Sequence, residues 1–166
     1  MKNNSDKTEL FNKTNYQIDD LDSEIKVDQL CSALLKRFHQ YLLNDQQLDP
    51  LEAGSQAAGA DYFLREFIIG GRRDNIFNCT AEQIKQFGGN WYIVKNLEPN
   101  MPELEIMLSG TASFFIFCAA NELTSSENAE QISSACADLD FFRQRINDFH
   151  AITGAGFKAW DKACPL

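Results

Sequence analysis

Apolar residues recur at helical spacing in several stretches of the chain, and the stretch 27–43 shows the pattern most clearly. Its apolar residues follow one another at intervals of three and four positions, which places them on one face of a helix. They are Val27, Leu30, Cys31, Leu34, Leu35, Phe38, Tyr41 and Leu42. Polar residues from Asn44 onward end the pattern. We therefore predict a first helix over 27–43 with one broad apolar face.

A second helix is predicted to begin at Asp49–Pro50 and to end at Gly70–Gly71. Asp49 suits the N-cap and Pro50 the first helical position. Its first half, 53–60, consists mostly of small residues and includes two glycines, each costing about 1 kcal/mol relative to alanine. Close approach of another helix would offset that cost, so this face either docks another chain or packs internally against the fourth predicted helix. The candidate positions are Ala53, Gly54, Ala57, Ala58 and Ala60.

Three further helices follow. Thr80–Gln83 matches a capping box and opens the third helix, in which Gly88–Gly89 marks a kink or a tightly packed position. The fourth helix is predicted from Glu103 to Asn121. Its segment 114–117 is apolar on all sides and is therefore predicted to be the most buried part of the chain. The fifth helix is predicted over 125–150.

The predicted fold class is all-α, because no alternating strand pattern with hairpin turns competes with the helical one. We expect a compact orthogonal or antiparallel bundle of five or six helices. Residues 27–152 form a single helical domain in this prediction, 1–26 a mobile N-terminal tail, and 153–166 a C-terminal tail. The predicted core contains Leu34, Phe38, Phe63, Phe67, Ile84, Phe87, Trp91, Leu108 and Phe115.

Charge is distributed unevenly along the 166 residues, whose formal net charge is −9. Between Asn96 and Phe142 there are eight acidic residues and no Lys or Arg. A net negative charge disfavours non-specific binding of the protein, by itself, to the phosphate backbone of a nucleic acid. The basic candidates for contact with phosphate or an acidic partner precede this stretch: Arg65, Arg72, Arg73, Lys85 and Lys95. The alternative is that they are solvated and balanced by Glu66, Asp74 and Glu82.

No residue pattern points to catalysis. The five cysteines form no CxxC pair, so we expect buried, reduced thiols in a cytoplasmic protein. The longest apolar run, 114–120, is too short to span a membrane. The only two histidines, His39 and His150, do not form a ligand cluster with other residues. We therefore predict that the protein is not an enzyme, with no catalytic, metal or cofactor-binding residues.

Several motifs follow one another in an order that carries a family resemblance. They are Phe38–Leu43 at the end of the first helix, Leu48–Asp49–Pro50, Phe63–Leu64, Thr80–Ile84 with Phe87, Gly110–Phe117, and Glu122–Leu123. In this order they resemble the N-terminal core-binding (SAM-like) domain of tyrosine recombinases and phage integrases. The resemblance covers 27–123 and implies a four-helix core of that type, to which 125–150 adds an extra helix.

The chain departs from this family in the parts that bind and cut DNA. The family presents polar and basic residues to DNA from its second and fourth helices, where this chain has small residues over 53–60 and the acids Glu103 and Glu105. The family's catalytic half has no room after Leu123. Our first hypothesis is therefore that the protein is a non-catalytic helical module with an interaction or regulatory role. It binds a protein partner or self-associates in this hypothesis, and it does not bind a membrane. The alternative is a DNA-associated accessory protein with weak duplex binding through the Arg65–Lys95 surface, which the net charge disfavours.

Overall fold

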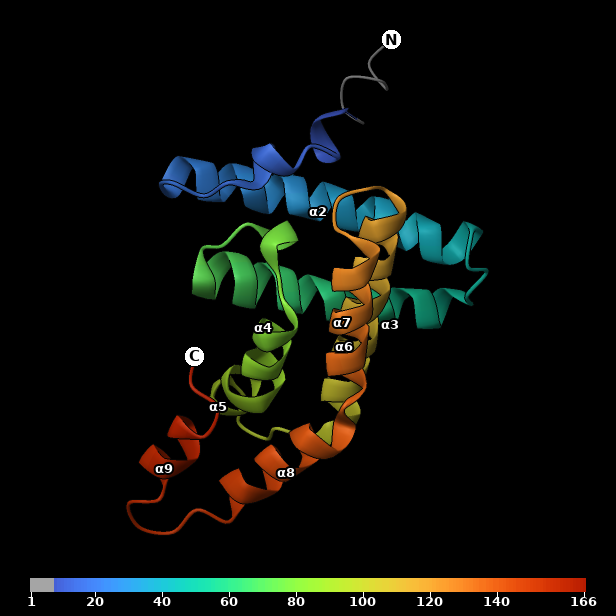
Figure 1. Ribbon diagram of the computed structural model, residues 1–166. Coiled ribbons are helices and arrows are strands. Elements are labelled where there is room, and N and C mark those ends of the chain that lie inside the picture. Colours follow the sequence, from blue (N-terminus) through green and yellow to red (C-terminus); the bar gives the residue numbers. More distant parts are fainter. Residues whose placement is uncertain (1–7) are drawn as a thin grey trace.

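The computed structural model describes residues 8–166, which form an all-helical fold without a β-strand among them (Figure 1). The α-helices are α2 (Leu21–Asn44), α3 (Pro50–Asp61), α4 (Ala81–Gln86), α5 (Tyr92–Lys95), α6 (Met101–Ala120), α7 (Ser126–Ala137), α8 (Leu139–His150) and α9 (Phe157–Lys162). The fold also contains two 3₁₀ segments, η1 (Lys13–Tyr16) and η3 (Ile76–Asn78), and two π-helical segments, η2 (Tyr62–Arg72) and η4 (Phe87–Trp91). The predicted all-α class is confirmed, and the predicted five or six helices are too few.

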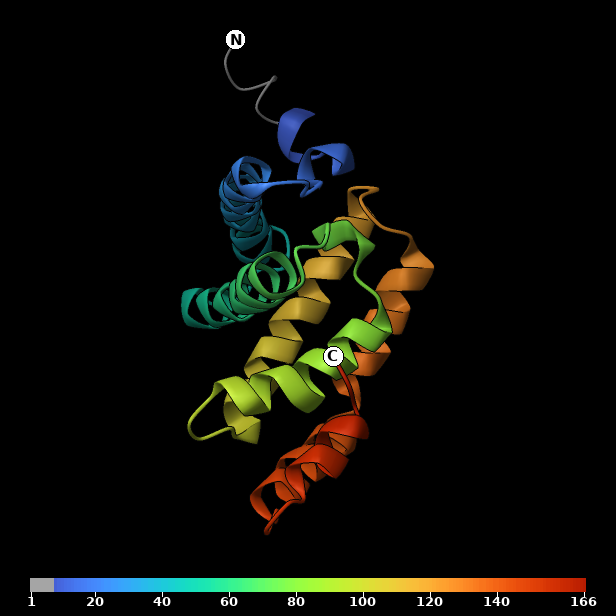
Figure 2. The ribbon, with the colours of Figure 1, turned by 90° about the vertical axis from the view of Figure 1, so that its left-hand side faces the viewer.

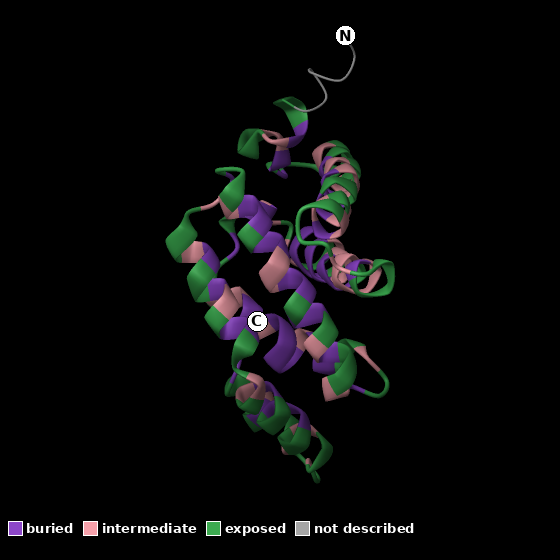
Figure 3. Cartoon of the chain, turned by 90° about the vertical axis from the view of Figure 1, so that its right-hand side faces the viewer, coloured by how far each residue is buried: buried purple, intermediate pink, exposed green. Residues whose placement is uncertain are grey.

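The helices form two groups that cross. In Figure 1, α2 and the continuous rod made of α3 and η2 lie one below the other, and α6 and α7 run across them. The turned view in Figure 2 shows the first pair nearly end-on, to one side of α6 and α7. At the opposite end of the molecule, α8 and α9 pack beside η4, and Figure 3 shows mostly exposed positions along their outward sides.

The chain is packed well before the predicted start of the first helix. Helix α2 begins at Leu21, six residues earlier than predicted, because Asp20 and Ser23 form a capping box with N–H···O distances of 2.8 and 2.9 Å. Tyr16 is fully buried, and its hydroxyl donates a hydrogen bond to the carbonyl oxygen of Leu10 at 2.7 Å. Residues 8–26 of the predicted mobile tail are thus part of the packed structure. Residues 1–7 lie outside the described residues.

Helix α3 begins as predicted, with Pro50 as its first residue. The Asp49 side chain accepts hydrogen bonds from two backbone N–H groups of the first turn. The helix then widens into the eleven-residue π segment η2, which ends just after Gly70–Gly71. Segments of this kind are rare and usually no longer than one turn. The aromatic rings of Phe63 and Phe67 on η2 pack against Phe87 on η4, with ring centroids 5.0 and 5.5 Å apart.

Helices α3 and α6 approach each other at backbone distance. A Cβ atom placed on Gly110 would lie 2.1 Å from the carbonyl oxygen of Gln56, and one on Gly59 would lie 2.8 Å from that of Ile106. Real Cβ atoms do not come this close, so only glycine fits at both positions. Part of the small-residue stretch therefore serves internal packing.

The predicted third helix is divided into α4, η4 and α5, although it starts as expected. Thr80 and Gln83 form the predicted capping box. The π segment η4 then contains Gly88–Gly89, and a Cβ on Gly88 would lie 2.6 Å from the ring of Phe142. The glycine pair is thus a tightly packed position, in which a ring from α8 occupies the space of a side chain.

The predicted fifth helix is also divided, at Asp138 between α7 and α8. Asp138 has a ψ of 62°, which no helical residue adopts. The turn at this residue redirects the chain so that Phe142, one turn later, becomes fully buried. The break coincides with the docking of this ring against Gly88 in a distant segment, a contact that local periodicity does not reveal.

The segment predicted as a C-terminal tail is docked on the domain. Its helix α9 places the indole of Trp160 against α8, where the Nε1–H donates to the carbonyl oxygen of Arg145 at 3.0 Å. The Asn90 side chain of η4 donates to the carbonyl oxygen of Cys164 at 2.7 Å and to Asp161 at 2.8 Å. Residues 157–164 are thus joined to α8 and η4.

The predicted core is correct with one exception. Eight of the nine predicted residues are buried, whereas Trp91 is only partly buried and packs at the margin of the core. The segment 114–117, predicted to be the most buried part of the chain, has one exposed position. Phe114, Phe115 and Phe117 are buried, but the side chain of Ile116 is 50% exposed.

Candidate interaction surfaces

The first basic candidate, Arg65, is held by carboxylates of its own chain. Its Nε and Nη2 atoms donate to the two carboxylate oxygens of Asp28 at 2.8 and 3.0 Å, and its Nη1 lies 3.4 Å from Asp61. The two-pronged hydrogen bond to Asp28 raises the pKa of the Arg65 guanidinium above its usual value. Arg65 therefore joins α2 to η2, and each of its three side-chain nitrogens contacts a carboxylate.

Three of the other four basic candidates are also paired. The pairs are Arg73 with Glu24 at 3.1 Å, Arg72 with Asp74 at 4.0 Å, and Lys85 with Asp138. Lys95 is exposed at the end of α5 and has no carboxylate within 4.0 Å among the described residues. Of the three acids predicted to balance this group, only Asp74 does so. The five cations lie on η2, the residue after it, α4 and α5.

The small-residue candidates on α3 separate into buried and open positions. Ala53 and Ala60 are buried in the core, Ala57 is partly buried, and Ala58 is exposed. A Cβ on Gly54 would have no heavy atom within 4 Å. The glycines that do permit close approach, Gly59 and Gly110, are absent from the candidate set. A small residue on each of two helices predicted to pack together is the signal that could have identified them.

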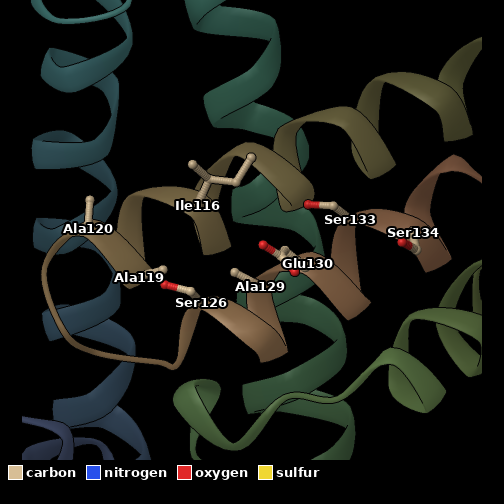
Figure 4. Close-up of a pocket in the computed structure, with 8 residues that line it drawn as sticks. All are labelled: Ile116, Ala119, Ala120, Ser126, Ala129, Glu130, Ser133 and Ser134. Atoms are coloured by element: carbon tan, nitrogen blue, oxygen red, sulfur yellow. The ribbon is translucent and has the colours of Figure 1, made fainter.

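The described surface has a wide hollow of about 700 Å³ between α6 and α7, which we call the α6–α7 groove (Figure 4). Helix α6 contributes Ile116, Ala119 and Ala120 to its lining, and α7 contributes Ser126, Ala129, Glu130, Ser133 and Ser134. All of these side chains except Ile116 and Glu130 are small. The groove is therefore a trough lined by small side chains, with one large apolar and one charged side chain.

Two neighbouring hollows continue the groove on either side. One of about 620 Å³ lies across α7, shares Glu130 and Ser134 with the groove, and extends to Lys85 on α4. The other, of about 150 Å³, lies across α6 and shares Ile116. Ile116 and Glu130 thus stand on the ridges between hollows.

The carboxylates placed at the α6–α7 groove and at the hollow beside it on α7 are those of Glu130 and Glu127. Both helices of the groove lie within 96–142, the stretch with eight acidic residues and no Lys or Arg. Lys85, which lines the neighbouring hollow, is paired with Asp138. Neither α6 nor α7 therefore contains a lysine or arginine that could neutralise the Glu130 carboxylate.

The cysteines offer no reactive thiol in this conformation. All five are buried and unpaired, as expected for reduced structural thiols. Burial raises the pKa of each thiol, that of Cys136 to about 12, so the nucleophilic thiolate is strongly disfavoured. Within residues 8–166, no group of three or more His, Cys, Asp or Glu side chains is placed to hold a metal ion.

Arg145 is a buried charged residue that is not among the predicted site residues. Its Nε donates to the carbonyl oxygen of Gly89 at 2.8 Å, and its guanidinium lies 4.1 Å from the centre of the Trp160 ring. Burial lowers the pKa of this guanidinium. These contacts connect α8 to η4 and α9, so Arg145 has a structural role here. Its position within the apolar face of α8 could have indicated that it is buried. This signal is weak, since many helices have an arginine at the margin of their apolar face.

Among the described helices, α6 is the one long and apolar enough to cross a membrane by length and composition. Half of that stretch is buried inside the fold, as in the core helix of a soluble protein, which passes the same test.

Comparison of the chain with protein-family models, with curated proteins and with solved structures finds no match.

Proposed function

We propose that the protein is a non-catalytic helical module that binds another protein through the α6–α7 groove. The observation that carries this proposal is the half-exposed Ile116 on the rim of a trough lined by alanine and serine. Burial of an exposed isoleucine side chain by a partner removes apolar surface from water and therefore favours binding. A trough between two packed helices has the shape that accepts the face of a third helix.

The chemistry of the groove favours binding over catalysis. Its lining contains serine hydroxyls and one carboxylate, but no histidine, cysteine, lysine or arginine. A serine nucleophile is commonly activated by a histidine or lysine, and no such base lines the groove; the groove also has no cation to hold an anionic substrate. The groove supplies apolar contact and a few hydroxyls, which suit a protein surface.

We also propose that α2–α6 form a scaffold of the integrase core-binding type, to which α7 and α8 are added. The order of the helices supports this, as do the caps at Asp49–Pro50 and Thr80–Gln83. The DNA-associated alternative has less support, because four of the five basic candidates are paired with carboxylates. Binding of a DNA duplex at sub-micromolar protein and low salt, measured by fluorescence anisotropy, would reverse this ranking.

Position-specific photo-crosslinking tests the interaction proposal. A photoreactive benzoylphenylalanine is introduced at Ile116, and in a matched variant at Ile106, which is also an α6 isoleucine of similar exposure, 48% against 50%. Illumination in the cells that produce the protein should give discrete protein adducts from position 116 and none from 106. No adduct from position 116, or the same adducts from both, would contradict the proposal.

A further inference from the structure

The shape and charge of the α6–α7 groove specify what kind of partner fits it, provided that the proposed interaction function holds. We infer that the groove binds an amphipathic helix with large apolar side chains on one face and lysine or arginine on its flanks. Three properties of the groove lead to this partner: its small lining residues, its exposed isoleucine and the carboxylates of Glu130 and Glu127.

The lining residues determine the shape of the partner. On α7, Ser126, Ala129 and Ser133 follow one another at intervals of three and four residues, so they lie along one side of the helix. Helices pack at 8–10 Å between axes, depending on the side chains at the contact. Small residues on the groove side leave space that the partner must fill. The partner therefore carries side chains the size of leucine, isoleucine or phenylalanine at the same helical spacing.

Ile116 provides the apolar contact on the other side of the groove. It lies on α6 beside Ala119 and Ala120, and half of its side chain is exposed. A partner helix seated between α6 and α7 would cover it. A helix is favoured over a strand because the described residues contain no sheet edge to extend.

Charge selects which amphipathic helix fits. Glu130 lines the groove, and Glu127 lines the hollow that continues it across α7. The stretch 96–142 supplies no cation to either, and Lys85 is engaged by Asp138. Basic residues on the flanks of the partner would meet these carboxylates. Complementary charge of this kind raises the association rate and excludes wrong partners.

The same charge argues against a second copy of this chain as the occupant. Two copies that met through this face would bring Glu130 and Glu127 of both copies together, in a protein whose net charge is −9. Like charges at an interface oppose association. A partner with basic flanks is therefore the occupant that the groove fits best.

Three synthetic helical peptides test the inference, with binding measured by fluorescence anisotropy against the full chain. The first has a leucine-rich face with lysine flanks, the second has the same face with glutamate flanks, and the third has the composition of the first in scrambled order. We expect the first to bind at least about tenfold more tightly than either of the others. Equal binding of the first and the scrambled peptide would overturn the inference, because charge alone would then explain it.

Two variants and one matched control locate the binding. Ile116→Glu should reduce affinity for the lysine-flanked peptide at least about tenfold, since it places a charge in the apolar contact. Ile106→Glu, at equal exposure on the same helix, should leave affinity unchanged. Glu130→Lys should lower the affinity for the lysine-flanked peptide and raise the affinity for the glutamate-flanked peptide. Equal effects at positions 116 and 106, or no change of preference with Glu130→Lys, would overturn the inference.

This inference and the proposed function can fail separately. Adducts from position 116 without a preference for the lysine-flanked peptide would overturn the basic-helix inference and leave the interaction function standing. Sedimentation equilibrium that shows a dimer lost in Ile116→Glu would do the same, because the occupant would then be a second copy. Absence of adducts from position 116 would contradict the interaction function itself.

Discussion

Replacing Gly110 with alanine should destabilise the protein, because it forces α3 and α6 apart. The new Cβ would lie 2.1 Å from the carbonyl oxygen of Gln56 and 2.9 Å from its carbonyl carbon. Non-bonded heavy atoms have their lowest energy at about 3.5–4.0 Å, so the two helices must separate locally by about 1 Å or more. Both contacted atoms belong to the backbone, so no side-chain rotation relieves the clash.

The size of the effect follows from two opposing contributions. Overpacking a well-packed interior by a methyl group costs about 1–3 kcal/mol, and this backbone clash belongs at the upper end. Alanine in place of glycine inside a helix gains about 1 kcal/mol. We therefore expect a net loss of about 1–2 kcal/mol in the free energy of unfolding. For a domain of this size, that lowers the Tm by roughly 2–8 °C.

The matched control is Gly54→Ala, also inside a helix but in open space. Its Cβ would meet no heavy atom within 4 Å, so only the gain in helix propensity remains. We expect Gly54→Ala to raise stability by up to about 1 kcal/mol. Urea unfolding followed by far-UV circular dichroism measures both variants, with equal slopes required for comparison. If both variants raise stability alike, α3 and α6 do not pack at Gly110 and the reasoning is refuted.

Three further predictions concern the core, the thiols and the glycine pair. Phe115→Ala should cost about 3–5 kcal/mol, because the ring is fully buried, and an unchanged thermal transition would refute its placement. A thiol reagent should label none of the five cysteines quickly in the folded protein and all five in denaturant. Stability should also fall as pH rises above about 8.5, because unfolded thiols then ionise while burial keeps the folded ones protonated; a flat pH profile there would contradict this. Gly88→Ala should cost about 1–3 kcal/mol, and a double-mutant cycle with Phe142→Leu should show coupling, since the new Cβ would lie 2.6 Å from that ring.

Two helix starts could be predicted from the sequence because their determinants lie within four residues of one another, whereas the equally local cap of α2 at Asp20 and Ser23 was not predicted. The two predicted caps, at Asp49–Pro50 and Thr80–Gln83, both occur at the predicted residue. Helix breaks could not be predicted in the same way. The turn at Asp138 and the π segment at Gly88–Gly89 accompany the docking of Phe142 on Gly88, a contact between segments far apart in sequence.

The candidate surfaces show the same limit. The basic residues could be read from the sequence, but the partners of Arg65 and Lys85 lie 37 and 53 positions away along the chain. Ile116 presents the opposite case. Helix α6 is apolar on nearly every side, so its periodicity cannot tell which residue remains in water. The exposure of Ile116 at the edge of the α6–α7 groove follows from the position of α7 beside α6, which the sequence pattern does not give.

The docking of 139–164 on η4 has a consequence for synthesis of the protein. A nascent chain that has emerged from the ribosome only to the end of α7 presents Gly88 and Gly89 without the ring of Phe142, and Asn90 without its acceptor at Cys164. Apolar surface left uncovered in this way is prone to aggregate. Translation must deliver residue 164 before that half of the molecule can close.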